Sequence, residues 1–159
     1  MREVVTCLSA LALSLSTAWD EPARLEFKTH GFSIEALEES SELLMHVVLM
    51  TLPRMDGFTP NINVQVQPYP GSVDEYVALT IAQCKQQNLT VVKTETRVNR
   101  AVFEYTGEMQ EQQLHFYAIA CKRGKKIILV TAAATQAQWP KVSKKLLRCA
   151  ESLKLDEAK

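Results

Sequence analysis

The sequence has little glycine and proline and no excess charge of either sign. Its 159 residues include five Gly and six Pro, too few for a collagen-like or low-complexity chain. Hydrophobic residues make up 47% and charged residues 23%, as in ordinary globular proteins. Eighteen basic and 18 acidic residues balance to a net charge of zero. Nucleic-acid-binding proteins usually carry a basic excess or a basic stripe, so nucleic acid is not the expected partner.

The motifs of common catalytic and metal sites are also missing. His30, His46 and His115 are far apart, and there is no His-x-x-x-His, Cys-x-x-Cys or acidic calcium loop. The chain has no Gly-x-Ser-x-Gly and no glycine-rich phosphate loop. We therefore expect no catalytic residue, no cofactor and no metal ion. His115 with Glu104 or Glu108 forms either an acid–base pair across a hairpin or a solvated contact between strands.

An apolar run from Val4 to Leu15 lies close to the N-terminus and is followed by the small residues Ser16-Thr17-Ala18. The run is shorter than the roughly 20 residues that cross a bilayer as a helix. This pattern predicts a signal peptide over residues 1–18 and export to the periplasm or the extracellular space. A short buried or interfacial helix is the alternative. We expect one domain over residues 19–159 and no transmembrane segment after cleavage.

The remaining patterns predict an α+β domain. Short strands are expected over residues 25–28, 32–37 and 42–52, and residues 61–67 alternate apolar and polar like a strand with one buried face. Ser72 and Glu75 have capping-box spacing at the start of a helix that ends near Asn88. Strands over residues 90–98, 101–105, 112–122 and 126–134 predict an antiparallel meander, and residues 140–153 predict a second helix. Because the last two strands are apolar on both faces, both faces should be covered.

Three stretches carry a resemblance to a known family. They are residues 57–66, the Ser72-x-Asp74-Glu75-Tyr76 helix start, and the run from Val130-Thr131-Ala132 to Trp139. Over about residues 25–155 the chain resembles the PsbP/DcrB-like superfamily, which implies an α/β/α sandwich: an antiparallel sheet with helices on both faces. The family includes a photosystem II extrinsic subunit, a bacterial envelope protein, a Ran-binding import factor and chaperones of secreted effectors, none known as an enzyme.

This resemblance and the predicted export together favour a non-catalytic binding or assembly module of the bacterial cell envelope, with a protein or other envelope component as its partner. A chaperone that binds apolar segments of secreted effectors is the alternative, and an enzyme with an unrecognised site is a third. Fold alone does not select among them, because members of one fold family differ in their partners.

Two features are candidates for recognition. Met50, Met55 and Phe58 surround the proline-bounded loop 53–60, which forms either an adaptable apolar contact or a part of the core. The basic run at residues 122–126 forms either a contact for an anionic lipid or acidic partner, or a solvated turn.

A disulfide between Cys121 and Cys149 is expected after export, because an oxidising compartment pairs thiols that lie close together. The hairpin at Arg123-Gly124 sets Cys121 opposite Lys126. Fourteen residues of returning helix span roughly 21 Å, or six to seven strand residues, which brings Cys149 back to about the level of Ile128. Cys84, on the apolar stripe of the first helix, is expected to stay a buried free thiol.

Overall fold

The computed structural model describes residues 24–27, 31–35 and 45–155, and the chain divides into two units between Ser40 and Ser41. In the first unit, β1 (Arg24–Phe27) and β2 (Phe32–Glu35) form an antiparallel pair. Gly31 has a φ of +71°, a left-handed conformation that suits glycine at this turn. The predicted signal peptide, residues 1–18, lies outside the described residues.

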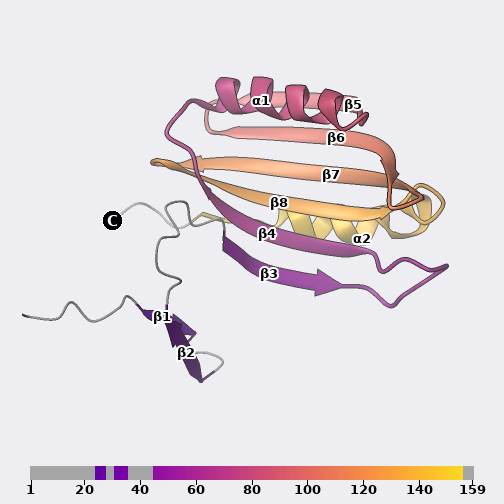
Figure 1. Ribbon diagram of the computed structural model, residues 1–159, viewed down its shortest axis with the longest axis horizontal. Helices are drawn as coiled ribbons and strands as arrows, with labels where there is room; N and C mark the ends of the chain where they lie inside the picture. The colour runs from indigo at the N-terminus through magenta and orange to yellow at the C-terminus, as the bar shows by residue number, and fades with distance from the viewer. Residues whose placement is uncertain (1–23, 28–30, 36–44, 156–159) are drawn as a thin grey trace, which may run out of the picture. The chain divides into compact units, whose positions relative to one another are not determined.

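The second unit is built on a six-stranded antiparallel sheet (Figure 1). Its spatial order is β3-β4-β8-β7-β6-β5, so β4, near the start of the unit, pairs with β8, the last strand described. β5 to β8 form the meander expected from the sequence. The strands are β3 (Met45–Thr51), β4 (Asn61–Pro68), β5 (Thr90–Arg97), β6 (Arg100–Met109), β7 (Gln112–Arg123) and β8 (Lys126–Thr135).

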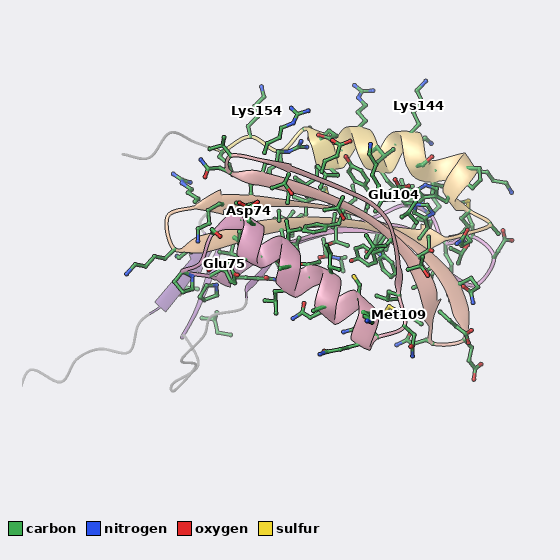
Figure 2. All side chains as sticks on the ribbon, turned by 90° about the horizontal axis from the view of Figure 1, so that it is seen from above. Asp74, Glu75, Glu104, Met109, Lys144 and Lys154 are labelled. Carbon is green, nitrogen blue, oxygen red and sulfur yellow. The ribbon has the colours of Figure 1, made fainter. Side chains whose placement is uncertain are left out.

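Two helices cover opposite faces of this sheet (Figures 1 and 2). α1 (Val73–Gln86) packs against β5 and β6, and α2 (Trp139–Glu151) packs against β8, β7 and β4 on the other face. The helices therefore lie over different halves of the sheet. The expected α+β class, an antiparallel sheet with helices on both faces, is confirmed.

The core consists of two apolar clusters, one beneath each helix. Phe103, which is 1% exposed, packs with Val73 and Tyr76 of α1. Ile119, also 1% exposed, belongs to the cluster under α2 with Val142 and Leu146. Ala118 and Ala120 of β7 belong to the cluster under α1, on either side of Ile119, because side chains of a strand alternate between the two faces. This explains why the last two strands are apolar at nearly every position.

One turn lies four residues beyond its predicted place. The sequence predicts that a strand ends at Tyr105 before Thr106-Gly107, but β6 continues to Met109. The reversal occurs at Gln110 and Glu111, with φ values of +52° and +62°. Gly107 stays within the strand, and a Cβ there would lie 2.4 Å from Leu89 Cδ2. The glycine therefore serves close packing against Leu89 and does not mark the turn.

Among the described residues, none of the helices is both long enough and apolar enough to span a bilayer.

Candidate functional site

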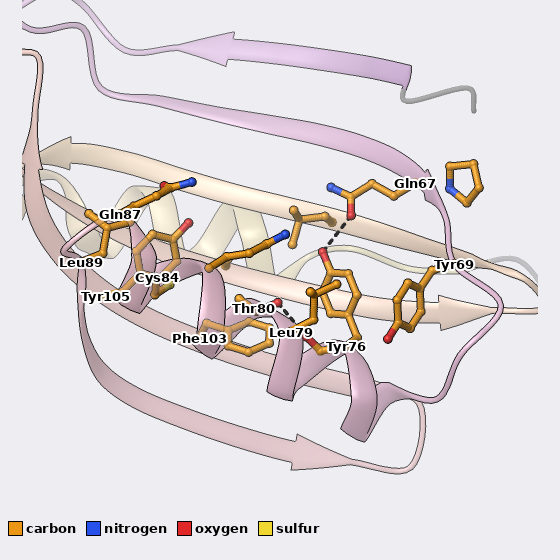
Figure 3. A pocket seen from close by; sticks show the side chains of 14 residues that line it. Gln67, Tyr69, Tyr76, Leu79, Thr80, Cys84, Gln87, Leu89, Phe103 and Tyr105 are labelled. Atoms are coloured by element: carbon orange, nitrogen blue, oxygen red, sulfur yellow. Dashed lines mark hydrogen bonds between the residues drawn. The ribbon is translucent and has the colours of Figure 1, made fainter. Parts of the chain in front are cut away.

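A groove of about 450 Å³ runs between α1 and the sheet (Figure 3). It lies where α1 leaves β8 uncovered, and Leu129 of β8 and Ala118 of β7 contribute to its floor. Its volume falls within the range of about 300–1,000 Å³ that is usual for ligand sites. The described residues that line it are Gln67, Pro68, Tyr69, Tyr76, Leu79, Thr80, Gln83, Cys84, Gln87, Leu89, Phe103, Tyr105, Ala118 and Leu129.

The capping box fixes the start of α1, and so places the helical wall of the groove. Glu75 N donates to Ser72 Oγ at 3.2 Å, and Ser72 N donates to Glu75 Oε2 at 2.7 Å. One turn later, the Tyr76 ring contacts Tyr69 edge-on at 5.1 Å between centroids and Phe103 at 6.4 Å. These aromatic contacts hold the helix at one angle to the sheet, because edge-to-face pairs have a preferred geometry.

The polar groups of the groove are hydroxyls and amides. Tyr76 Oη donates to Gln67 Oε1 at 2.9 Å, and Thr80 Oγ1 donates to the Tyr76 carbonyl oxygen at 2.8 Å (Figure 3). Two more amides line the groove, from Gln83 of α1 and from Gln87, the C-cap residue of this helix. None of the described lining residues carries a charged side chain. The groove therefore suits a neutral ligand with both apolar and hydrogen-bonding parts.

Three buried ionisable groups of the groove, those of Tyr76, Tyr105 and Cys84, stay uncharged at neutral pH. Burial raises the pKa of Tyr76 to about 12 and raises the pKa of Tyr105 further. Burial also raises the pKa of Cys84 above its ordinary value of 9.0, so this thiol remains protonated. A protonated thiol is a poor nucleophile, and a phenol with so high a pKa is a poor base at neutral pH. The arrangement is suited to binding.

A second polar cluster lies on the face covered by α2. His115 Nε2 is 2.7 Å from Glu104 Oε1, and the His115 ring stacks on Trp139 at 4.0 Å between centroids. Of the two partners considered from the sequence, the histidine therefore contacts Glu104, whereas Glu108 accepts from Gln113 at 3.2 Å. The contact joins β6 and β7 side by side, as cross-strand pairs do.

The same face holds an ion pair at the end of α2. Glu151 accepts hydrogen bonds from Arg100 of β6 and from the Tyr117 hydroxyl of β7. Burial is the main reason that the pKa of Tyr117 is raised, and the neighbouring Glu151 raises it further. Within the described residues, no group of three or more His, Cys, Asp or Glu side chains is placed to hold a metal ion. Of the other histidines, His46 lies in β3 and His30 lies outside the described residues.

The residues proposed as a contact loop are in two different settings. Met55 and Phe58 are half-buried and pair with each other through two backbone hydrogen bonds of 3.0 Å. Gln138 Nε2 donates to the carbonyl oxygen of Met55, so this loop is held from inside. Met50 instead lies in edge strand β3 with 44% of its surface exposed. Met50 alone of the three is free to adapt to a partner.

The expected disulfide between Cys121 and Cys149 is not formed in the structure, where both are free thiols. In the hairpin, Lys126 pairs with Arg123, and Cys121 pairs with Ile128. Cys121 therefore lies at the level along β8 to which Cys149 is predicted to return. The prediction is wrong about the side of α2 on which Cys149 lies. Cys149 faces Met50 and Leu52 near β3.

Cys121 lies towards the other side of α2, beside Arg100, which contacts Glu151. Ala150, between Cys149 and Glu151, is fully buried against the sheet. Neighbouring helix positions differ by about 100°, so Cys149 and Glu151 lie on different sides of α2, and Cys121 lies near Arg100 and Glu151. Cys84 is the buried free thiol that the sequence predicts.

Sequence patterns did not reveal the groove. The helical period of Val73, Tyr76, Val77, Thr80, Ile81 and Cys84 predicts a buried Ile81 and leaves out Leu79. In the structure Ile81 is 41% exposed, and Leu79, 44% exposed, lines the groove. Leu79 is a large apolar side chain outside the buried stripe of the helix, and this is the sequence feature that could have indicated an apolar site beside α1. The floor, including Leu129, could not be inferred because it depends on how far α1 reaches across the sheet.

Comparison with known proteins supports the fold. No protein-family profile and no curated protein matches the sequence. Among solved structures, a Pseudomonas aeruginosa protein of unknown function, PA94, superposes with a TM-score of 0.67 at 13% identity, covering 86% of this chain and 98% of that one. A cyanobacterial PsbP from Synechocystis sp. PCC 6803 has a TM-score of 0.46 at 13% identity, covering 84% of this chain and 92% of its own. At 13% identity, the likeness to PA94 concerns the fold alone.

Proposed function

We propose that the protein is a non-catalytic binding module that holds a segment of a partner polypeptide in the groove beside α1. The observation that carries this proposal is the neutral lining of the groove. Apolar side chains such as Leu79 and Leu129 alternate there with amides such as Gln67 and Gln83. A peptide segment offers matching chemistry, because its side chains supply apolar surface and its backbone supplies N–H and C=O groups.

The lack of a charge in the groove also sets the partner's chemistry. An ionised side chain would lose its hydration on entering the groove and would find no opposite charge among the described lining residues. The favoured segment therefore carries no charge where it contacts α1. The raised pKa values of Cys84, Tyr76 and Tyr105 support a role in binding without acid–base or thiolate chemistry.

We place this activity outside the cytoplasm, in the bacterial cell envelope. The support is the apolar run from Val4 to Leu15 with Ser16-Thr17-Ala18 after it. Protein purified from its native host should begin at Trp19. N-terminal sequencing tests this placement, and recovery of Met1 would contradict it without bearing on the groove.

Two exposed residues of α1 allow a controlled test of the groove. Leu79 and Ile81 are 44% and 41% exposed on the same helix, but only Leu79 lines the groove. The L79E variant introduces a charge into the groove, and I81E introduces the same charge outside it. Tagged wild type, L79E and I81E are used to capture proteins from the native envelope fraction, with identification by mass spectrometry.

A partner captured by wild type and I81E and lost with L79E supports the proposal. Equal capture by all three variants contradicts it, provided that circular dichroism shows all three folded.

Chaperoning of apolar segments of secreted effectors is the second candidate, favoured by the apolar part of the lining, Leu79, Leu89 and Phe103. A chaperone of this kind acts inside the cell and keeps its N-terminus. Native protein that retains Met1 and binds a neutral apolar peptide through Leu79 would favour the chaperone over the envelope module.

A further inference from the structure

A second cavity lies on the opposite face of the sheet, between α2 and edge strand β3. Its volume is about 210 Å³. Its walls come from β3 and the residue after it, from β4, and from α2. The lining residues are Met50, Thr51, Leu52, Ile62, Lys145, Leu146 and Cys149. Apart from the Thr51 hydroxyl and the Lys145 ammonium, every side chain there is apolar or a thiol.

A row of cations follows the outer side of the same helix. Lys141, Lys144, Lys145 and Arg148 recur at positions i, i+3, i+4 and i+7, so they share one face, and all four are exposed. Lys144 points away from the sheet (Figure 2). The acidic residue of α2, Glu151, is engaged by Arg100 and Tyr117. Within α2, the charge of this row is therefore not neutralised.

Lys145 belongs to both features, because it lines the cavity and is one of the four cations. We propose that the cavity binds the hydrocarbon chain of a single-chain amphiphile, with its anionic head group at Lys145. A cavity of about 150 Å³ with apolar walls is enough to bind benzene, so 210 Å³ can hold a larger part of a hydrocarbon chain. Met50, 44% exposed, is an unbranched side chain that can move to admit the chain.

The charge pattern selects this ligand over an acidic protein. An acidic protein surface would contact the outward cations such as Lys141 and Lys144 and would leave the apolar cavity empty. An uncharged hydrocarbon would fill the cavity but would form no ion pair with Lys145. An anionic amphiphile uses both, since its charge and its hydrocarbon are joined at the position where Lys145 meets the cavity.

Cys149 provides a readout, because it lines the cavity and is only half-buried. The full chain is treated with a maleimide, and the alkylation rate of Cys149 is followed by peptide mass spectrometry. Decanoate and decyltrimethylammonium, which share a chain length and differ in charge, are added below their micellar concentrations. We expect decanoate to protect Cys149 at concentrations roughly two- to five-fold lower than the cation, as one exposed ion pair allows.

Two charge reversals on α2 are the matched variants. K145E should reverse the preference, so that the cation protects better than decanoate. K144E changes the net charge equally but does not touch the cavity, and should keep the preference of wild type. Three results would each overturn the proposal: no protection by decanoate, equal protection by both amphiphiles, or the same behaviour in K144E and K145E. Decanoate that slows alkylation of the buried Cys84 to the same degree would also overturn it, since it would then act on the whole protein.

Discussion

Gln138, at the start of α2, donates its side-chain Nε2 to the carbonyl oxygen of Met55, a residue 83 positions earlier. Gln138 is 1% exposed, and its Oε1 also accepts from Thr135 N at 3.1 Å. One buried amide thus joins the loop before β4, the end of β8 and the beginning of α2. These three segments are distant in sequence and come together only when the sheet has formed.

Replacing this amide should destabilise the domain. In Q138A, the Thr135 N–H loses its partner, which costs about 1–3 kcal/mol, and the Met55 carbonyl oxygen keeps only its bond from Phe58 N. Urea unfolding followed by circular dichroism measures the loss. Q136A is the control, since Gln136 is exposed. Equal unfolding midpoints for Q138A and Q136A would show that the amide does not hold the loop.

The capping box of α1 should make stability depend on pH in acid. Hydrogen bonds from Ser72 lower the pKa of Glu75 below its ordinary value of 4.5. The bond to the carboxylate stabilises the folded state at pH values above that ordinary value. This contribution is lost as the pH falls through the lowered pKa. S72A should cost about 1 kcal/mol near neutral pH. It removes the hydroxyl and keeps the backbone N–H bond to Glu75, so the pKa of Glu75 should rise only part of the way towards 4.5, as followed by NMR titration. An unchanged titration in S72A would exclude the Ser72 hydroxyl as a cause.

Oxidation should leave the α2 face unchanged. Because Cys149 lies beside Met50 and Leu52 whereas Cys121 lies near Arg100 and Glu151, non-reducing peptide mapping should recover both cysteines without a cross-link. A disulfide closing this loop would contribute about 3–4 kcal/mol in the chain-entropy model. Unfolding midpoints with and without reductant should therefore agree. A cross-linked peptide in most of the protein would mean that α2 is rotated from the orientation described.

Imidazole chemistry should be dispensable for binding in the groove. His115 contacts Glu104 and Trp139 on the face opposite to α1. H115Q should cost about 1–2 kcal/mol of stability through the lost hydrogen bond and ring contact. It should capture the same partner as wild type in the envelope experiment. Lost capture with a wild-type unfolding midpoint would give this histidine a role in function.

Local patterns predict much of the second unit. The alternation of Ile62, Val64 and Val66 predicts β4, and the Ser72–Glu75 spacing predicts the start of α1 to the residue. The meander is predictable because its turns are short and its strands pair with their neighbours in sequence. The pairing of β4 with β8 is not predictable in this way, because it joins residues as distant in sequence as Asn61 and Ala133, and no local pattern specifies such a partner.

The sites were harder to predict because they depend on the lateral positions of the helices. A rotation of α2 by one residue would exchange the places of Cys149 and Ala150, and periodicity does not resolve such a step. Apolar sequence positions such as Leu79 and Met50 predict burial in general. Whether Leu79 and Met50 line a cavity depends on where the neighbouring helix stops covering the sheet.

Because the two helices lie over different halves of the sheet, the domain has two separate places for a ligand. The groove and the smaller cavity open on opposite faces and share β4, which gives Gln67 to one and Ile62 to the other. Ligands at the two places do not compete for space. A molecule arranged in this way can act as a bridge, tethering a polypeptide on one side to an amphiphile on the other. A bridging role would require both ends in one complex, so variants at Leu79 and Lys145 would each abolish it independently.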